Sequence, residues 1–294
     1  MTSYDDPLFW VHGAGGNVLS MRPLAMALPA ELPVYCFQAK GLDGSEPFHS
    51  VEETAQCYVD EIRKVQPHGP YYLGGGCYGG VVAFEMARTL AEHGEAVGAL
   101  FLLDSYNPAF GRFLSKPELL YRNVLFLARC VIAHARKMAR LRPREWAGYF
   151  EARLKTASRR VWALVKVLTG ASASQVPSDF AMAGLEASAG TRIGEILKRV
   201  MTANLVASSR FVPKPYAGGA TIFRAKVRMV EPYQDDYLGW GPVIRGGFEV
   251  FDIDGDHATM AEVPSVSQIA EKIDAKLRQA TPAREPARGE KVSR

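Results

Sequence analysis

Residues 71–87 read YYLGGGCYGGVVAFEMA, and this stretch decides the fold of the chain. Tyr71–Gly75 is a short apolar run typical of a buried strand, and Val81–His93 has the amphipathic pattern of a helix. Between them, Cys77 occupies the centre of a Gly-x-Cys-x-Gly turn, the pattern of a nucleophile elbow, in which serine is the usual central residue. The glycines are needed because strand and helix approach closely around a strained turn. The stretch predicts Cys77 as a nucleophile whose sulfur lies near the positive end of a helix dipole, which favours the thiolate.

Three further motifs follow in the order that such an elbow requires. The loop VHGAGGN at 11–17 comes directly after an apolar run and is of the type that supplies one backbone N–H of an oxyanion hole; Tyr78, which follows the nucleophile, supplies the other. Asp104 ends the apolar run after the elbow helix. His257 lies in the sequence DGDHATM after the last predicted strand. The order nucleophile, acid, base predicts Cys77, Asp104 and His257 as a catalytic triad.

Two other carboxylates compete with Asp104 for the role of the acid. Asp235 and Asp236 follow the strand before that of His257, a place where many hydrolases with this elbow keep their acid. We favour Asp104 and keep the pair as the alternative. His12 is interpreted as packing against the oxyanion loop or orienting it rather than reacting, and His257 is the histidine that follows a terminal strand.

Short apolar runs bounded by Gly and Pro alternate with amphipathic stretches along much of the chain. This pattern predicts an α/β protein with a mostly parallel sheet and helices on both faces. The predicted strands are Leu8–His12, Val34–Gln38, Tyr71–Gly75, Ala99–Leu103, Ala220–Ala225 and Phe248–Ile253. The predicted helices are Ser50–Val65, which opens with the capping-box sequence Ser-Val-Glu-Glu, Val81–His93 and Val266–Gln279.

A segment of different character separates the fourth predicted strand from the fifth. Residues 108–215 have few strand signals and long helical periodicity, so we predict a helical lid inserted between two parts of one core, 1–107 and 216–280. The helical periodicity is strongest at 117–141 and 144–168. The last residues, 281–294, contain almost no apolar side chain and are predicted to be a disordered tail.

Charge is divided unevenly along the chain. Residues 112–166 contain fourteen Lys and Arg against three acidic residues, a net charge of +11, whereas the remainder carries −7. A basic lid would steer an acidic partner toward the site; the alternative is a solvated helical face whose arginine stems cover apolar surface. No recognition motif for nucleic acid accompanies the charge, so nucleic acid is not expected as a partner. Adhesion of 118–141 to a membrane surface is a weaker alternative.

The composition places the chain among globular proteins. Its 294 residues are 48% hydrophobic and 22% charged, which excludes disorder, collagen and coiled coil for the whole chain. The four cysteines lack CxxC pairing and the sequence starts without a signal segment, so we expect reduced thiols and a cytoplasmic location. Cys36, Cys57 and Cys130 are expected as small buried side chains. No apolar run is long enough for a membrane span.

These motifs together resemble the thioesterase domains of non-ribosomal peptide and polyketide synthases. The resemblance extends from Pro7 to about Gln279 and is carried by PLFWVHGAGGN, VYCFQAKGLDG, VEETAQCYVDEIRKVQPHGPYYLGG, the elbow with VVAFEMA, LLDSYNP, LGWG and GDHATM. It implies the α/β-hydrolase fold. It also implies Cys77 as nucleophile, Asp104 as acid, His257 as base, and the N–H groups of Ala14 and Tyr78 as oxyanion donors.

The resemblance also implies a reaction and a partner. Thioesterase domains of this family take an acyl or peptidyl chain from the phosphopantetheine arm of a carrier protein and release it by hydrolysis, cyclisation or transfer. The expected partners are therefore an acyl or peptidyl carrier protein and a small-molecule acceptor, which is an amine, a hydroxyl, a thiol or water. No bound cofactor or metal is expected, because the substrate arrives on the phosphopantetheine arm.

The chain departs from the commonest pattern of this family at Cys77, where serine is usual. A cysteine keeps the acyl group as a thioester, so transfer or cyclisation ranks level with plain hydrolysis. A cysteine introduced to trap the acyl-enzyme is the other explanation for this residue. A hypothesis of a different class is a non-catalytic binding module that keeps the elbow only as architecture, and the presence of all three triad residues argues against it.

Overall fold

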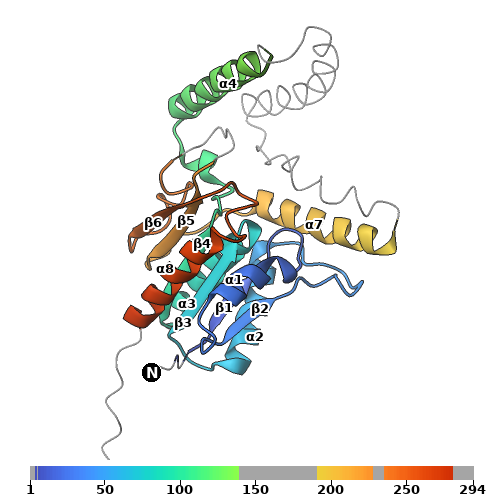
Figure 1. Cartoon of the computed structure of the whole chain (residues 1–294), viewed down its shortest axis with the longest axis vertical. Helices are drawn as coiled ribbons and strands as arrows, with labels where there is room; N and C mark the ends of the chain where they lie inside the picture. Colours follow the sequence, from blue (N-terminus) through green and yellow to red (C-terminus); the bar gives the residue numbers. More distant parts are fainter. Residues whose placement is uncertain (1–3, 5, 139–190, 228–234, 281–294) are drawn as a thin grey trace, which may run out of the picture.

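A computed structural model of the chain describes residues 4, 6–138, 191–227 and 235–280. Within these ranges six strands form one parallel sheet in the order β2-β1-β3-β4-β5-β6 (Figure 1). The strands are β1 (Leu8–Val11), β2 (Val34–Phe37), β3 (Tyr71–Gly76), β4 (Val97–Leu103), β5 (Ala220–Ala225) and β6 (Phe248–Ile253). The strand predictions are confirmed, with ends that move by at most two residues.

Alternate residues of β1 pack into two separate core layers, one on each face of the sheet. Phe9 and Val11 join the layer built with α2 (Val51–Val65) and α3 (Tyr78–Glu92), whereas Leu8 and Trp10 join the layer beneath α1 and α8. The bounds of these last two helices are Arg22–Ala27 for α1 and Val266–Ala280 for α8. Figure 1 shows α1 and α8 together on one face of the sheet. Because both faces are covered, β1 to β4 contain only apolar residues and glycine, as the sequence predicts, whereas β5 and β6 also contain charged residues.

The start of α2 follows from its capping residues. Ser50 Oγ accepts a hydrogen bond from the N–H of Glu53 at 3.0 Å. The carboxylate of Glu53 reaches back to the N–H of His49 at 3.1 Å, one residue before the expected partner. One N–H group that the first helical turn leaves unpaired, that of Glu53, and the N–H just before the helix, that of His49, are thereby satisfied. The helix ends at Val65, just before Pro67.

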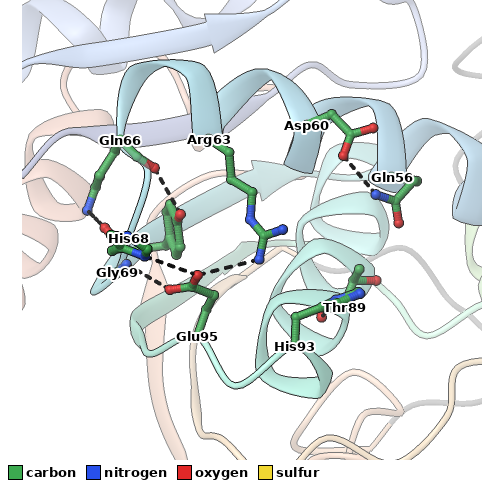
Figure 2. Close-up of polar contacts among 10 residues, drawn as sticks. Gln56, Asp60, Arg63, Gln66, His68, Gly69, Thr89, His93 and Glu95 are labelled. Carbon is green, nitrogen blue, oxygen red and sulfur yellow. Dashed lines mark hydrogen bonds and ion pairs between the residues drawn. The ribbon is translucent and has the colours of Figure 1, made fainter.

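A carboxylate ties together the opposite end of the sheet, where β3 begins (Figure 2). Glu95, in the turn between α3 and β4, accepts a hydrogen bond from the N–H of Gly69 at 3.1 Å. The same carboxylate contacts Arg63 of α2 at 3.5 Å and His68 at 3.6 Å. These contacts hold the loop before β3 against α2, so the strand that leads to the elbow begins from a fixed position.

The strands β4 and β5 are neighbours although residues 104–219 separate them in the chain. In this stretch the structure describes two long helices, α4 (Lys116–Met138) and α7 (Arg192–Arg210). The helix predicted at 117–141 is confirmed by α4 as far as Met138, and residues 139–141 lie outside the described residues. Figure 1 shows α4 standing clear of the sheet and α7 lying beside it. The second helical stretch, 144–168, and the tail 281–294 lie outside the described residues.

The structure corrects one prediction and adds one element. Cys36 is exposed and Cys57 half-buried, whereas both were expected to be buried. Cys36 belongs to β2, an edge strand that has a neighbour on one side only, and this explains its exposure. The helix α1 was not predicted, because six residues that contain a proline give a weak periodic signal. None of the described helices is both long and apolar enough to cross a bilayer.

Candidate active site

Cys77 lies between the end of β3 and the first residue of α3. Its backbone has φ 54° and ψ −120°, a conformation that residues with a side chain rarely adopt. Two hydrogen bonds hold the turn in place. The N–H of Cys77 donates to the carbonyl of Leu103 at 3.0 Å, and its carbonyl accepts from Ser105 Oγ at 2.7 Å. Both partners lie at the end of β4, so the elbow is fixed to the neighbouring strand.

The glycines around Cys77 are required by close backbone contacts. A Cβ atom on Gly75 would lie 2.3 Å from the carbonyl carbon and oxygen of Gly79. A Cβ atom on Gly79 would lie 2.4 Å from the carbonyl oxygen of Val11. Neither backbone atom can rotate away as a side chain could. The glycines therefore allow α3 to begin directly against β1 and β3, as the pattern of the elbow predicts.

The structure brings the three predicted triad residues together. The Nδ1–H of His257 donates to Oδ2 of Asp104 at 2.7 Å, and a hydrogen bond joins His257 to Cys77. The side chain of Asp104 is 4% exposed and that of His257 is 32% exposed. Cys77, Asp104 and His257 follow β3, β4 and β6, and the carboxyl ends of these parallel strands lie at one edge of the sheet.

Asp104 is held by backbone groups of the neighbouring strand β5. Its own φ is 41°, and its N–H donates to the carbonyl of Phe223 at 2.7 Å. Its Oδ1 accepts a hydrogen bond from the N–H of Ala225 at 3.2 Å. One carboxylate oxygen therefore faces β5 while the other faces His257.

The two competing carboxylates, Asp235 and Asp236, have other partners. Asp235 Oδ1 accepts hydrogen bonds from the N–H groups of Tyr237, at 3.0 Å, and Gly239, at 2.6 Å, and so caps a turn. Asp236 is exposed and its carboxylate lies 3.4 Å from the guanidinium of Arg224. The carboxylate that contacts His257 is that of Asp104.

The hydrogen bonds of His257 with Cys77 and Asp104 determine how Cys77 and His257 are protonated. Burial alone would lower the pKa of His257, but its hydrogen bonds with Asp104 and Cys77 raise that pKa to about 11. Burial acts to raise the pKa of the Cys77 thiol, and the hydrogen bond and charge of His257 outweigh it, so that this pKa is lowered. The arrangement favours a thiolate beside an imidazolium at neutral pH.

The direction of the Ala14 N–H is fixed by the carbonyl of the preceding residue. Gly13 O contacts His12 Nδ1 at 2.8 Å and accepts the N–H of Gly16 at 2.9 Å. In a planar trans peptide the C=O and N–H bonds point in opposite directions, so the N–H of Ala14 points away from both partners. The other predicted donor, the N–H of Tyr78, hydrogen-bonds to Cys77 at the start of α3.

His12 orients this loop as a neutral side chain. Burial lowers its pKa to about 4, so its ring carries one proton at neutral pH. Because a carbonyl oxygen only accepts, that proton sits on Nδ1 and points at Gly13. Nε2 then accepts from the hydroxyl of Tyr58 at 2.8 Å, and the ring stacks on Tyr78 at 5.9 Å between centroids. The interpretation of His12 as a packing and orienting residue agrees with these contacts.

The structure adds supporting residues that the sequence argument did not identify. Trp240 Nε1 donates to the carbonyl of Ser105 at 2.7 Å, and Asn107 Nδ2 donates to the carbonyl of Gly239 at 2.8 Å. These bonds attach the loop after Asp104 to residues more than a hundred positions away. The only sequence signal was the motif LGWG, which contains Trp240 and Gly239 but carries no information about its partners.

Comparisons with known proteins place this chain in a family. The family model named Thioesterase domain matches residues 6–277. Nonribosomal peptide synthetase apvA of Aspergillus terreus is 45% identical over 95 residues, which are 32% of this chain and 10% of that protein. Malpinin synthetase of Mortierella alpina is 26% identical over 279 residues, 93% of this chain and 3% of that protein. The chain spans between 3% and 12% of the length of such curated relatives.

Solved structures agree on the fold. The NocB thioesterase domain from the Nocardicin cluster superposes with a TM-score of 0.61 at 20% identity, covering 94% of this chain and 95% of its own. RedJ thioesterase from the Prodiginine pathway of Streptomyces coelicolor superposes with a TM-score of 0.58 at 19% identity, covering 94% and 92%. Both agree with the six-stranded parallel sheet of an α/β-hydrolase. Since the family model spans nearly the whole chain, the chain belongs to the thioesterase domain family and has the α/β-hydrolase fold.

Proposed function

We propose that this chain takes an acyl or peptidyl chain from the phosphopantetheine thioester of a carrier protein onto Cys77 and releases it by transfer, cyclisation or hydrolysis. The observation that carries the proposal is the hydrogen-bonded series from Cys77 through His257 to Asp104, with 2.7 Å between the histidine and the carboxylate. The relatives support the substrate class, because they are synthetases and synthases of natural-product type.

In the first half-reaction Cys77 attacks the carbonyl carbon of the bound thioester. His257 holds the proton of the thiol, and a carbon–sulfur bond forms as the carbonyl π electrons move onto oxygen. The N–H groups of Ala14 and Tyr78 donate to that oxyanion. Collapse breaks the bond to the pantetheine sulfur, and His257 passes its proton to the departing thiolate. Asp104 keeps the imidazole ring oriented and stabilises its charged form.

The cysteine determines the energetics of this step. A serine at the elbow would convert a thioester into a more stable oxoester, whereas a cysteine exchanges one thioester for another. The first step is then nearly balanced in free energy, and the acyl group keeps its transfer potential. An amine, a hydroxyl or a second thiol that binds at the site can use that potential in the second half-reaction, in competition with water.

The partner follows from the same reasoning. The relatives that match are multidomain proteins of which this chain covers a small part, which supports a carrier protein as the source of the acyl group. The basic segment 112–166 is proposed to attract the carrier, because a net charge of +11 steers an acidic surface toward it. Part of this segment lies outside the described residues.

Intact-protein mass spectrometry tests the proposal. The chain is incubated with acyl-pantetheine thioesters, with and without amine, thiol and hydroxyl acceptors. We expect the acyl mass on a peptide that contains Cys77, and no adduct in the Cys77→Ala variant. Cys57→Ala is the matched control, because Cys57 is a half-buried thiol on α2, and this variant should be acylated like the wild type.

Two outcomes would overturn the proposal. A Cys77→Ala variant that turns over thioesters at a comparable rate would exclude Cys77 as the covalent nucleophile. The non-catalytic binding module would be favoured by two results together. The wild-type chain never acquires the acyl group, and the His257→Ala variant is labelled by iodoacetamide in the same way as the wild type. Comparing the products with and without acceptors separates transfer or cyclisation from plain hydrolysis.

A further inference from the structure

The helix α7 is packed tightly onto loops at the edge of the sheet that carries Cys77. Its residue Val200 is fully buried, and a Cβ atom on Gly16 would lie 2.9 Å from Val200 Cγ1. A Cβ atom on Gly41 would lie 3.1 Å from the other methyl group of Val200. Arg199 adds two hydrogen bonds of 2.8 Å to the carbonyls of residues 44 and 45. The helix is therefore fixed against the loops that follow β1 and β2.

One residue of α7 reaches the predicted oxyanion loop itself. Asn204 is 4% exposed, and its Nδ2 donates to the carbonyl of Ala14 at 2.9 Å. Because a carbonyl only accepts, the amide nitrogen must be the atom that faces it. The contact joins residues 190 positions apart.

Ala14 is thereby held on both sides. The peptide plane before it is fixed by His12 and the N–H of Gly16, which bond to the carbonyl of Gly13. The peptide plane after it is fixed by Asn204 through the carbonyl of Ala14. Two fixed planes determine both backbone dihedrals of Ala14, and with them the direction of its N–H. Without Asn204, only the first plane keeps its side-chain partner.

We propose that Asn204 is a positioning residue that sets the oxyanion donor of Ala14, and that α7 thereby links the segment between β4 and β5 to the chemistry at Cys77. This inference rests on the proposed function. Asn204 does not touch the reacting atoms; it acts through the backbone of Ala14. Its effect should therefore appear in the step that builds an oxyanion and in no other.

Two reactions of Cys77 make this distinction measurable. Acylation by a pantetheine thioester passes through an oxyanion, whereas alkylation by iodoacetamide displaces iodide at a saturated carbon and forms none. In Asn204→Ala and in the nearly isosteric Asn204→Asp, we expect the acylation rate to fall about 10- to 100-fold, because removing one oxyanion donor outright costs about 10²- to 10³-fold. The alkylation rate and KM should change less than threefold, so the loss appears in kcat.

The carboxyl introduced by Asn204→Asp offers a further readout. Buried next to a carbonyl, it has a raised pKa, and once protonated it can donate to Ala14 O as the amide does. The ratio of acylation to alkylation rate should therefore recover toward the wild-type value as pH falls in Asn204→Asp, and stay low in Asn204→Ala. Taking the ratio removes the change in thiolate fraction from the comparison.

Arg199→Ala is the matched control, because Arg199 also anchors α7 but bonds to residues 44 and 45 instead of the oxyanion loop. It should leave the ratio of the two rates unchanged. The inference is overturned if Asn204 variants acylate at the wild-type rate, if they lose alkylation to the same extent, or if Arg199→Ala lowers the ratio equally. A wild-type chain that is alkylated at Cys77 but never acylated would refute the proposed function, and this role of Asn204 with it.

Discussion

Replacing Asp104 with asparagine should leave the site folded and reverse the roles of the ring nitrogens of His257. Oδ1 of Asp104 accepts the N–H of Ala225 at 3.2 Å, so the amide oxygen of Asp104→Asn will take that position. The amide nitrogen then takes the place of Oδ2 and points its N–H at Nδ1 of His257, 2.7 Å away. Nδ1 must become an acceptor, which moves the ring proton to Nε2. In this tautomer Nε2 cannot accept the proton of Cys77.

The size of the effect follows from the pKa of the thiol. In the wild type, the hydrogen bond and charge of His257 lower the pKa of Cys77. In Asp104→Asn the histidine is neutral and in the wrong tautomer, so the pKa of Cys77 should rise to at least its ordinary value of 9.0. At pH 7 about one thiol in 100 is then ionised, so the rates of alkylation and acylation should fall to about one hundredth of the rate of a fully ionised thiol. Serine triads lose about 10⁴-fold on the same change, because a serine hydroxyl cannot ionise by itself.

The assay is the rate of iodoacetamide alkylation of Cys77 between pH 5 and pH 10, followed by mass spectrometry. The wild type should react well below pH 8, whereas Asp104→Asn should recover toward the wild-type rate as pH rises through 9. Asp235→Asn and Asp236→Asn are the controls and should keep the wild-type profile. An unshifted profile in Asp104→Asn, or an equal shift in Asp235→Asn, would show that the acid is not Asp104.

Two further predictions concern the elbow and the partner. Gly75→Ala places a Cβ atom 2.3 Å from backbone atoms of Gly79, so it should lower the free energy of unfolding by about 3 kcal/mol or more and Tm by roughly 6–12 °C. Gly241→Ala is the control, because its Cβ would meet a side chain at an ordinary 3.6 Å, and it should cost less than about 1 kcal/mol. Equal losses in the two variants would contradict the steric argument. Turnover of a carrier-bound thioester should fall as salt is added, because the Debye length shrinks to about 8 Å near physiological ionic strength, while turnover of a pantetheine mimic stays constant. Reversing Arg136, Lys137 and Arg140 to Glu should raise KM for the carrier substrate alone, and an equal response of both substrates would exclude docking through the basic segment.

The sheet and the predicted triad could be predicted from the sequence because their signals are local. The elbow can be recognised from a few consecutive residues, because Gly75, Cys77 and Gly79 meet the steric requirement of a single turn. Asp104 and His257 each follow a buried strand, and parallel strands bring their carboxyl ends to one edge. Strand order and turn chemistry together were sufficient to propose which side chains meet.

The supporting contacts could not be predicted, because they depend on how distant segments dock. The bond from Asn204 to Ala14 depends on the placement of α7, a helix within a long segment whose position no local pattern encodes. The bond from Trp240 to the carbonyl of Ser105 depends likewise on how the loop before β6 meets the end of β4. Exposure of Cys36 required knowing that β2 is the edge strand, which is a property of strand order and not of its own residues.

His12 and His257 lie at the same edge of the sheet, and the groups that contact each ring explain why their pKa values differ. Among the described residues His12 has a carbonyl and a phenol as partners and no carboxylate, so burial lowers its pKa to about 4 and the ring stays neutral. His257 has a buried carboxylate on one ring nitrogen and a thiol on the other, and its pKa is raised to about 11. In the proposed reaction, a proton released by Cys77 therefore moves to His257 and not to His12, although both rings lie at the same edge of the sheet. His12 instead orients the predicted oxyanion loop, which requires the neutral tautomer with its proton on Nδ1.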